Sequence, residues 1–431
     1  MSGLGISPGA VPAGEPAVAV PLRSRLVKDS AALGLGQTVA LAAGALAALL
    51  AARWLGATAK GQLTLMFAVP ALLGPLAAGG VDSYIAARAG GRDPQQRRAV
   101  VGLGVRAARW GGVALASATL AYGIGTGLPP GPVLFAAVLA GLRPGLAVAQ
   151  AVATSDDQVA RVGRALVAMA AAQLSLVVVL AADGASVADF AAASALSVLV
   201  GRRLLRPARS RPGAGAPAEL AAAQRRQVLR FGGAVVVGDA LQLANYRMDL
   251  FVLAAFVPVA DIGVYAVAVA LAEILWQLPQ AVSRSILPRI VAGQLDRAGV
   301  LRISKALGAV TAGLALVGWL LAVHLVEPVF GSDFARVPLV LAVLLPGAVL
   351  VSAAKPIAAW TLSCGCPSRN VRASAAGFAV VAAGNVLLVP SFGIVGAAVA
   401  STLGYGVVAA GVALLAPASH PSTSLDPEET S

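Results

Sequence analysis

The chain has few of the residues that enzymes use for chemistry. Its 431 residues include two cysteines and two histidines, and only 12% are charged and 5% aromatic. Cys364 and Cys366 cannot form a disulfide framework, and a Cys-x-Cys pair without a nearby histidine is weak evidence for a metal site. Because 58% of the residues are hydrophobic, the composition excludes an ordinary globular domain.

Long apolar runs account for most of the sequence. Each is close to the ~20 residues needed to cross a hydrocarbon layer about 30 Å thick. There are twelve, at 30–53, 62–87, 99–124, 131–153, 164–182, 185–203, 229–256, 261–285, 303–327, 336–360, 371–390 and 393–416. The pattern predicts an all-α integral membrane protein with about 12 transmembrane helices.

Basic residues are distributed unevenly between the connections of these runs. The N-terminal arm and the even-numbered connections carry 24 Lys and Arg residues, whereas the odd-numbered connections carry only Arg53, Lys60 and Arg336. Connections rich in Lys and Arg stay on the cytoplasmic side, so both termini are expected in the cytoplasm. This asymmetry also explains the net charge of +13, and no nucleic-acid partner is expected.

The longest hydrophilic stretch divides the runs six and six. The predicted organisation is a disordered cytoplasmic N-terminus at 1–28, a six-helix bundle at 29–203, a basic cytoplasmic linker at 204–228, a second bundle at 229–416 and a disordered tail at 417–431. Two halves with six spans each enter the membrane in the same sense, which predicts a parallel repeat. A shift of 202 residues places Trp54–Leu63 over Phe256–Tyr265, in each case a turn with a glycine between two helices.

Charged and polar residues inside the apolar runs are the candidates for a functional cavity. A charge at a helix centre costs about 2.5–3.5 kcal/mol on insertion scales, so such a residue usually faces a bundle interior or water. Arg143 is about twelve residues into its run. Polar stripes in the seventh and eighth runs are expected to face each other or water. The candidate substrate cavity comprises Asp82, Arg88, Arg143, Gln150, Gln242, Tyr246, Arg247, Asp249, Glu273, Trp276, Gln277 and Arg284. Interhelical packing is the alternative role for these residues.

Several motifs occur in the order found in a known family. Ala52–Gly61 is similar to an Arg-x-Leu-Gly-x-x-x-x-Gly turn, Tyr246–Asp249 with Asp261–Tyr265 to an Arg-x-Asp helix followed by Gly-x-Tyr, and Asn385–Ala398 to an Asn-x-x-Leu-x-Pro-x-x-Gly-x-x-Gly-Ala-Ala junction. The chain therefore resembles the polysaccharide-biosynthesis flippases of the multidrug/oligosaccharidyl-lipid/polysaccharide superfamily. The resemblance implies a V-shaped pair of six-helix bundles with a central cavity and an alternating-access mechanism.

The leading hypothesis is a flippase for an undecaprenyl-diphosphate-linked oligosaccharide in the bacterial cytoplasmic membrane. Its expected partners are this lipid-linked glycan, membrane lipids, a possible coupling proton or sodium ion, and proteins of glycan synthesis and polymerisation. The alternative is a multidrug/cation antiporter of the same superfamily. A membrane glycosyl polymerase is disfavoured by the short outer connections, and a non-transporting scaffold is a further reading. No catalytic, metal-binding or cofactor-binding residue is predicted.

Overall fold

A computed structural model describes residues 19–90, 93–182, 184, 186–206 and 220–418, and these contain helices and turns but no strand. In chain order the α-helices are α1 (Ala19–Leu73), α2 (Val81–Arg88), α3 (Pro94–Gly125), α4 (Pro130–Ser155), α5 (Val159–Ala182), α6 (Val187–Leu204), α7 (Ala222–Phe256), α8 (Val259–Leu275), α9 (Gln277–Val291), α10 (Arg297–Phe330), α11 (Val337–Ser363) and α12 (Pro367–Leu415). The short 3-10 helices η1 (Gly74–Leu76) and η2 (Ser332–Phe334) precede α2 and α11.

The two longest helices are hairpins. With 55 and 49 residues, α1 and α12 would each be more than about 70 Å long if straight, over twice the hydrocarbon thickness. Gly56 and Gly393 interrupt them with positive φ angles of 76° and 54°, a conformation that residues with a Cβ avoid. In α12 a Cβ on Gly384 would lie 2.8 Å from that of Ala400, so the two arms run side by side.

Counting these reversals gives the expected number of membrane crossings. Eight helical segments in the described part of the chain are long and apolar enough to cross a membrane, and the α1 and α12 segments each cross twice. The remaining crossings are α6 and α7, of 18 and 35 residues, which lie outside that set of apolar helices. The prediction of an all-α membrane protein with about 12 transmembrane helices is confirmed.

The second span of each half is broken. The sequence predicts continuous runs at 62–87 and 261–285, but η1 and a turn separate α1 from α2, and Trp276 separates α8 from α9. Gly74 and Trp276, where the two breaks begin, are 202 residues apart, the same shift that relates the two turn motifs. At Trp276 the backbone stays hydrogen-bonded, since its N–H donates to the Glu273 carbonyl oxygen and its own carbonyl oxygen accepts from the Gln280 N–H, each at 3.1 Å.

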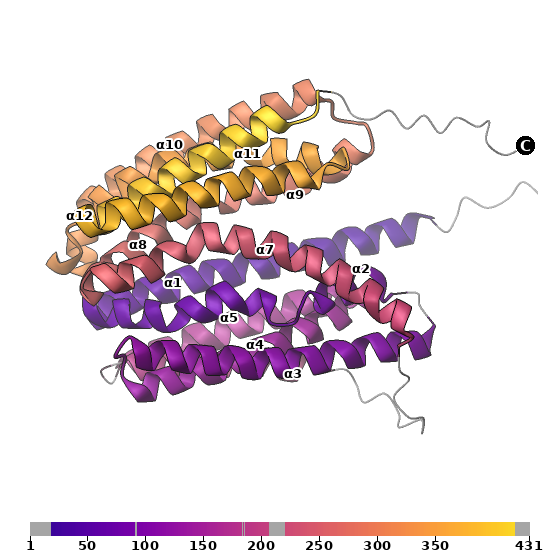
Figure 1. Cartoon of the computed structure of the whole chain (residues 1–431), viewed down its shortest axis with the longest axis horizontal. Coiled ribbons are helices and arrows are strands. Elements are labelled where there is room, and N and C mark those ends of the chain that lie inside the picture. The colour runs from indigo at the N-terminus through magenta and orange to yellow at the C-terminus, as the bar shows by residue number, and fades with distance from the viewer. Residues whose placement is uncertain (1–18, 91–92, 183, 185, 207–219, 419–431) are drawn as a thin grey trace, which may run out of the picture.

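The two halves lie side by side (Figure 1), and reciprocal contacts relate them to each other. We call α1–α6 the first half and α7–α12 the second half; the hairpin end contains Gly56 and Gly393, and the basic end contains the start of α7 and the end of α12. At the hairpin end, a Cβ on Gly61 would overlap the Val259 carbonyl oxygen, and one on Gly263 would overlap that of Ala57. Because each pair is the other shifted by 202 residues, the contact supports a two-fold relation between the halves.

A second crossing joins the halves at the basic end. A Cβ on Gly80, just before α2, would overlap the carbonyl oxygen of Gly232 in α7. Beside this contact the Tyr84 ring meets the edge of Phe231 at a centroid distance of 5.5 Å, and the Arg88 guanidinium lies 5.2 Å from the same Phe231 ring. Helix α7 therefore packs on the first half at this end, while along its length it also packs on α12.

The ends of the helices differ from the expected boundaries. Helix α1 begins at Ala19 and α7 at Ala222, before the apolar runs expected to start at 30 and 229, because helices extend past their apolar cores into polar flanks. Residues 1–18, 207–219 and 419–431, which hold most of the predicted termini and linker, lie outside the described residues. The connections at the hairpin end are short, as expected.

Candidate functional site

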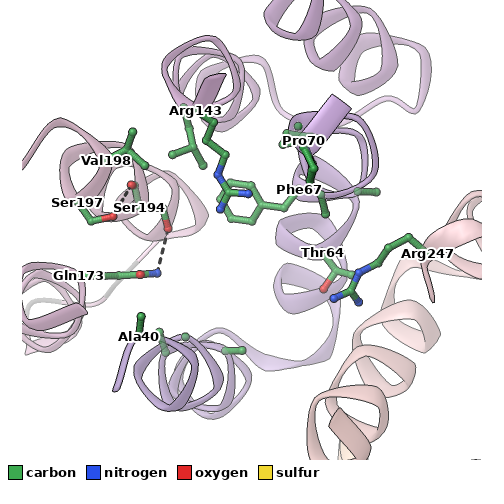
Figure 2. A pocket seen from close by; sticks show the side chains of 18 of the residues that line it. Ala40, Thr64, Phe67, Pro70, Arg143, Gln173, Ser194, Ser197, Val198 and Arg247 are labelled. Atoms are coloured by element: carbon green, nitrogen blue, oxygen red, sulfur yellow. Dashed lines mark hydrogen bonds between the residues drawn. The ribbon is translucent and has the colours of Figure 1, made fainter. Parts of the chain in front are cut away.

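A cavity of about 770 Å³ lies between the halves and extends into the first half (Figure 2). It is lined by residues of α1, α2, α4, α5 and α6 on one side and of α7 and α8 on the other. Small residues of the first span, such as Ala40 and Gly44, line it, and Pro70 and Pro75 lie where the second span approaches its break.

Arg143 projects from α4 into this cavity (Figure 2). Among the described residues, ion pairs join Arg97 to Asp156, Arg247 to Glu273 and Arg336 to Asp261, so Arg143 belongs to none. Hydroxyl and amide groups line the same region, where the Gln173 Nε2 donates to the Ser194 Oγ at 3.3 Å. Gln150 lies two turns further along α4 and also lines the cavity. This region of the cavity can therefore offer a guanidinium and neutral polar groups to a ligand.

Two paired acidic residues lie where α7 and α8 face the cavity. The Glu273 Oε1 is 3.0 Å from the guanidinium nitrogen Nη2 of Arg247. Asp249, which is 5% exposed, accepts a hydrogen bond from the Tyr265 hydroxyl at one oxygen and one from the Leu250 N–H, at 2.8 Å, at the other. Both carboxylates are thus already paired, and Arg247 points toward Thr64 of α1 across the boundary between the halves (Figure 2).

Lys60 was missed by the sequence reasoning. The apolar runs place it in an odd-numbered connection, yet α1 turns at Gly56, so Lys60 is already inside the second span and lines the cavity at 6% exposure. Its charge interacts with those of Arg247 and Glu273, and in the described part of the chain it has no ion pair. The sequence does carry a signal for the position of Lys60. The 202-residue shift relates the neighbouring Gly61 to Gly263, and both glycines lie at the crossing of α1 and α8.

Two further carboxylates line the cavity beyond the paired ones. Asp82 of α2 and Asp239 of α7 come from opposite halves, and their charges are close enough to interact. The Asp82 Oδ1 is buried and lacks a hydrogen-bond partner among the described residues. Asp239 also lines a second cavity, so α7 separates two hollows.

The second cavity, of about 440 Å³, lies within the second half, between α7, α9, α11 and α12. Gln242 and Tyr246 line it, and the Gln242 Nε2 donates to the Tyr246 hydroxyl at 3.4 Å. The Lys355 ammonium, on the far wall, donates to the Gln280 Oε1. The sequence interpretation placed Gln242, Tyr246 and Asp249 on one face, but the structure divides them between the two cavities.

Four of the predicted site residues lie away from both cavity walls or have side chains outside the described part of the chain. Arg88 lies over Phe231 at the basic end. Trp276 packs its ring 5.1 Å from that of Tyr246 and 5.5 Å from that of Tyr405, and its indole Nε1 is buried without a partner among the described residues. Gln277 is exposed at the start of α9, and the Arg284 side chain lies outside the described residues. Among the residues described, no group of three His, Cys, Asp or Glu side chains is arranged to hold a metal.

Neither a protein-family model nor a curated protein sequence matches this chain. Solved structures do. The chain is similar to an inward-facing multidrug resistance MATE family transporter of the MOP superfamily, with 15% identity, a TM-score of 0.69 and coverage of 88% of this chain and 96% of the other. It is similar to the lipid II flippase MurJ in an inward closed conformation, with 11% identity, a TM-score of 0.71 and coverage of 89% and 86%.

An outward-facing structure of a multidrug resistance MATE family transporter gives a lower TM-score of 0.54, at 14% identity and with coverage of 92% of this chain and 97% of the other. At these identities the likeness concerns the fold. The chain therefore has the fold that multidrug MATE transporters and the lipid II flippase MurJ share.

Proposed function

We propose that this protein is an alternating-access transporter that flips an undecaprenyl-diphosphate-type lipid-linked oligosaccharide across the bacterial cytoplasmic membrane for cell-surface polysaccharide synthesis. The observation that carries the proposal is Arg143, a cavity guanidinium without an acidic partner among the described residues. The basic end is cytoplasmic in this proposal, because connections rich in Lys and Arg remain on that side.

The physical task of such a transporter fits the arrangement of the cavity. A diphosphate in hydrocarbon carries a desolvation penalty that runs to tens of kcal/mol on Born estimates. A guanidinium offers paired N–H donors that match phosphate oxygens, and it remains charged at any physiological pH. The neutral polar groups beside Arg143, including Gln150, Gln173 and Ser194, suit the hydroxyl groups of a sugar.

Structural likeness supports the transport mechanism. One of the similar structures is a lipid II flippase, and the chain scores higher against inward structures than against the outward-facing one. In the proposed cycle, the present state is closed at the hairpin end by the crossing of Gly61 and Gly263. Opening that crossing while the contact of Gly80 with Gly232 holds the basic end closed would present the cavity to the hairpin side.

A cation antiporter is the second candidate, and one observation favours it. Asp82 and Asp239 line the cavity, belong to no ion pair among the described residues and interact across the boundary between the halves. Membrane-embedded carboxylates of this kind carry protons or sodium ions in other transporters. In a flippase the same residues would hold a coupling ion. The two functions are therefore distinguished by identifying the transported substrate.

The test is deletion of the gene followed by analysis of lipid-linked sugars. The flippase proposal predicts that they accumulate in the cytoplasmic leaflet. Complementation with Arg143→Lys should restore export partly, because lysine keeps the charge but loses the planar set of guanidinium donors. Complementation with Arg143→Ala should restore almost no export. Both variants should be present in the membrane at normal abundance. Arg109→Ala, an exposed arginine of α3 away from both cavity walls, is the matched control. Unchanged lipid-linked sugars together with altered drug susceptibility would establish the antiporter instead.

A further inference from the structure

We propose that Lys60 and Arg247 form an anion-binding pole in the large cavity, and that Glu273 occupies this pole as an internal anion until a substrate phosphate displaces it. The proposal rests on the flippase function for the identity of the substrate, but the pole itself follows from the side chains. It assigns a binding role to Lys60, which the sequence places in an outer connection.

The first step is the position of Lys60. Its side chain is 6% exposed, lines the cavity and lies one turn before Thr64, whose hydroxyl donates to the Lys60 carbonyl oxygen at 2.9 Å. A buried ammonium needs an anionic or polar partner, yet no ion pair of Lys60 occurs among the described residues. An unpaired buried charge destabilises the fold, so a functional ligand is the expected partner.

The second step is the identity of its neighbours. Lys60 is close enough to Arg247 and Glu273 for all three charges to interact, and these residues come from α1, α7 and α8. Arg247 and Glu273 pair at 3.0 Å, and each side chain keeps 30% of its surface exposed toward the cavity. Glu273 therefore pairs with one of two neighbouring cations, while Asp249, on the same cavity wall, is the second carboxylate that acts on Arg247.

The third step is why Glu273 is the exchangeable anion. Asp249 is 5% exposed, and both of its oxygens already accept hydrogen bonds, from the Tyr265 hydroxyl and the Leu250 N–H. It is therefore fixed in place. Glu273 makes one ion pair from a partly exposed position, so a phosphate can take its place on Arg247 while also contacting Lys60. The diphosphate of such a lipid carries two negative charges and can contact both cations, which a single carboxylate cannot.

The pole also bridges the two halves of the protein. Lys60 lies next to Gly61, where α1 crosses α8, and Arg247 belongs to α7 of the second half. An anion held by both residues would tie the first half to the second beside the crossing at the hairpin end. Binding and the opening of that crossing are therefore expected to depend on each other.

Binding of inorganic pyrophosphate to the purified full-length protein in detergent tests the pole directly, by isothermal titration. Glu273→Gln, which removes the internal competitor, should bind about tenfold more tightly than the unaltered protein, and Lys60→Gln about tenfold more weakly. Lys60→Arg should retain binding. Lys355→Gln, which alters the lysine of the second cavity, is the matched control and should leave pyrophosphate affinity unchanged.

Thermal unfolding of the same variants separates a binding role from a structural one. If Lys60 awaits a ligand, Lys60→Gln should raise the unfolding temperature while lowering pyrophosphate affinity, because it removes an unpaired buried charge. If Glu273→Gln does not fold, the Lys60 series still decides, because it leaves the Arg247–Glu273 pair intact.

The proposal is overturned if Lys60→Gln and Lys355→Gln have equal affinities, or if folded Glu273→Gln binds no more tightly than the unaltered protein. These outcomes are independent of the proposed function, which is judged by lipid-linked sugars in cells. Pyrophosphate binding with the expected pattern but without a glycan phenotype would support the anion pole and contradict a lipid-linked glycan as the substrate. A glycan phenotype without that pattern would retain the flippase and reject the pole.

Discussion

Two close backbone contacts at glycines join the halves of this protein, and the two are built differently. At the hairpin end the contact is reciprocal, with Gly61 against Val259 and Gly263 against Ala57. At the basic end Gly80 meets Gly232, and Phe231 of α7 packs against Tyr84 and Arg88 of α2.

This difference indicates how the two ends contribute to a transport cycle. The reciprocal contact brings helix backbones together without interposed side chains, so it should be sensitive to a single added methyl group. The contact at the basic end adds an aromatic pair and an exposed cation over a ring, interactions that can form and break at a cost of about 1 kcal/mol each. We therefore expect the basic end to open more readily than the hairpin end.

The largest effect is expected from a bulky residue at the reciprocal crossing. Gly61→Leu would force side-chain atoms into the Val259 carbonyl, so the hairpin end should no longer close and transport should fall to background. A cysteine at Thr64 should then react with an impermeant thiol reagent from outside the cell. Gly313→Leu in α10, where a Cβ meets no atom within 4 Å, is the control and should transport normally. An active Gly61→Leu protein would show that this crossing need not close.

A smaller effect is expected at the basic end. A Cβ added to Gly232 would lie 2.6 Å from the Gly79 carbonyl oxygen, so Gly232→Leu should hold α7 away from the turn before α2. Reactivity of a cavity cysteine should rise from the cytoplasmic side, and transport should fall several-fold. The neighbouring Gly233 has no atom within 4 Å of such a Cβ, so Gly233→Leu is a closely matched control. Equal effects of the two substitutions would contradict a contact specific to Gly232.

The smallest effect is expected from Arg88. A cation over an aromatic ring at an exposed site contributes about 0.5–1 kcal/mol, so Arg88→Gln should shift the balance between open and closed states by about two- to fivefold. In the Phe231→Leu protein, Arg88→Gln should cause no further shift in this balance, because the ring that Arg88 contacts is already absent. The population of the open basic end, measured by distances between spin labels on α2 and α7, checks this coupling. Additive effects would show that Arg88 acts elsewhere.

The sequence predicted the membrane crossings because each requires an apolar stretch of fixed length, whatever its neighbours. It did not predict the breaks at Gly74 and Trp276, since the apolar runs at 62–87 and 261–285 continue past both positions. Lys60 was misplaced because the apolar runs leave a connection at 54–61, whereas the chain turns at Gly56 alone and is helical again before Lys60.

The pairing of polar residues was beyond the sequence as well. The two polar stripes of the seventh and eighth spans do meet, through Arg247 with Glu273 and Tyr246 with Trp276. Helical spacing alone placed Gln242 and Asp249 on one face, but which hollow each residue lines depends on the helices packed on either side of α7. Tyr265, whose hydroxyl is buried against Asp249, gave no polar signal within an apolar helix.

The most direct test of the account is flipping by the purified protein. Proteoliposomes containing a fluorescent undecaprenyl-diphosphate-linked oligosaccharide in both leaflets would be treated with a membrane-impermeant quencher, and the protected fraction measured over time. We predict that the unaltered protein moves the protected lipid to the accessible leaflet, that Arg143→Ala does not, and that a labelled glycolipid without phosphate is not moved. Protection equal to that of protein-free liposomes would contradict the proposed function.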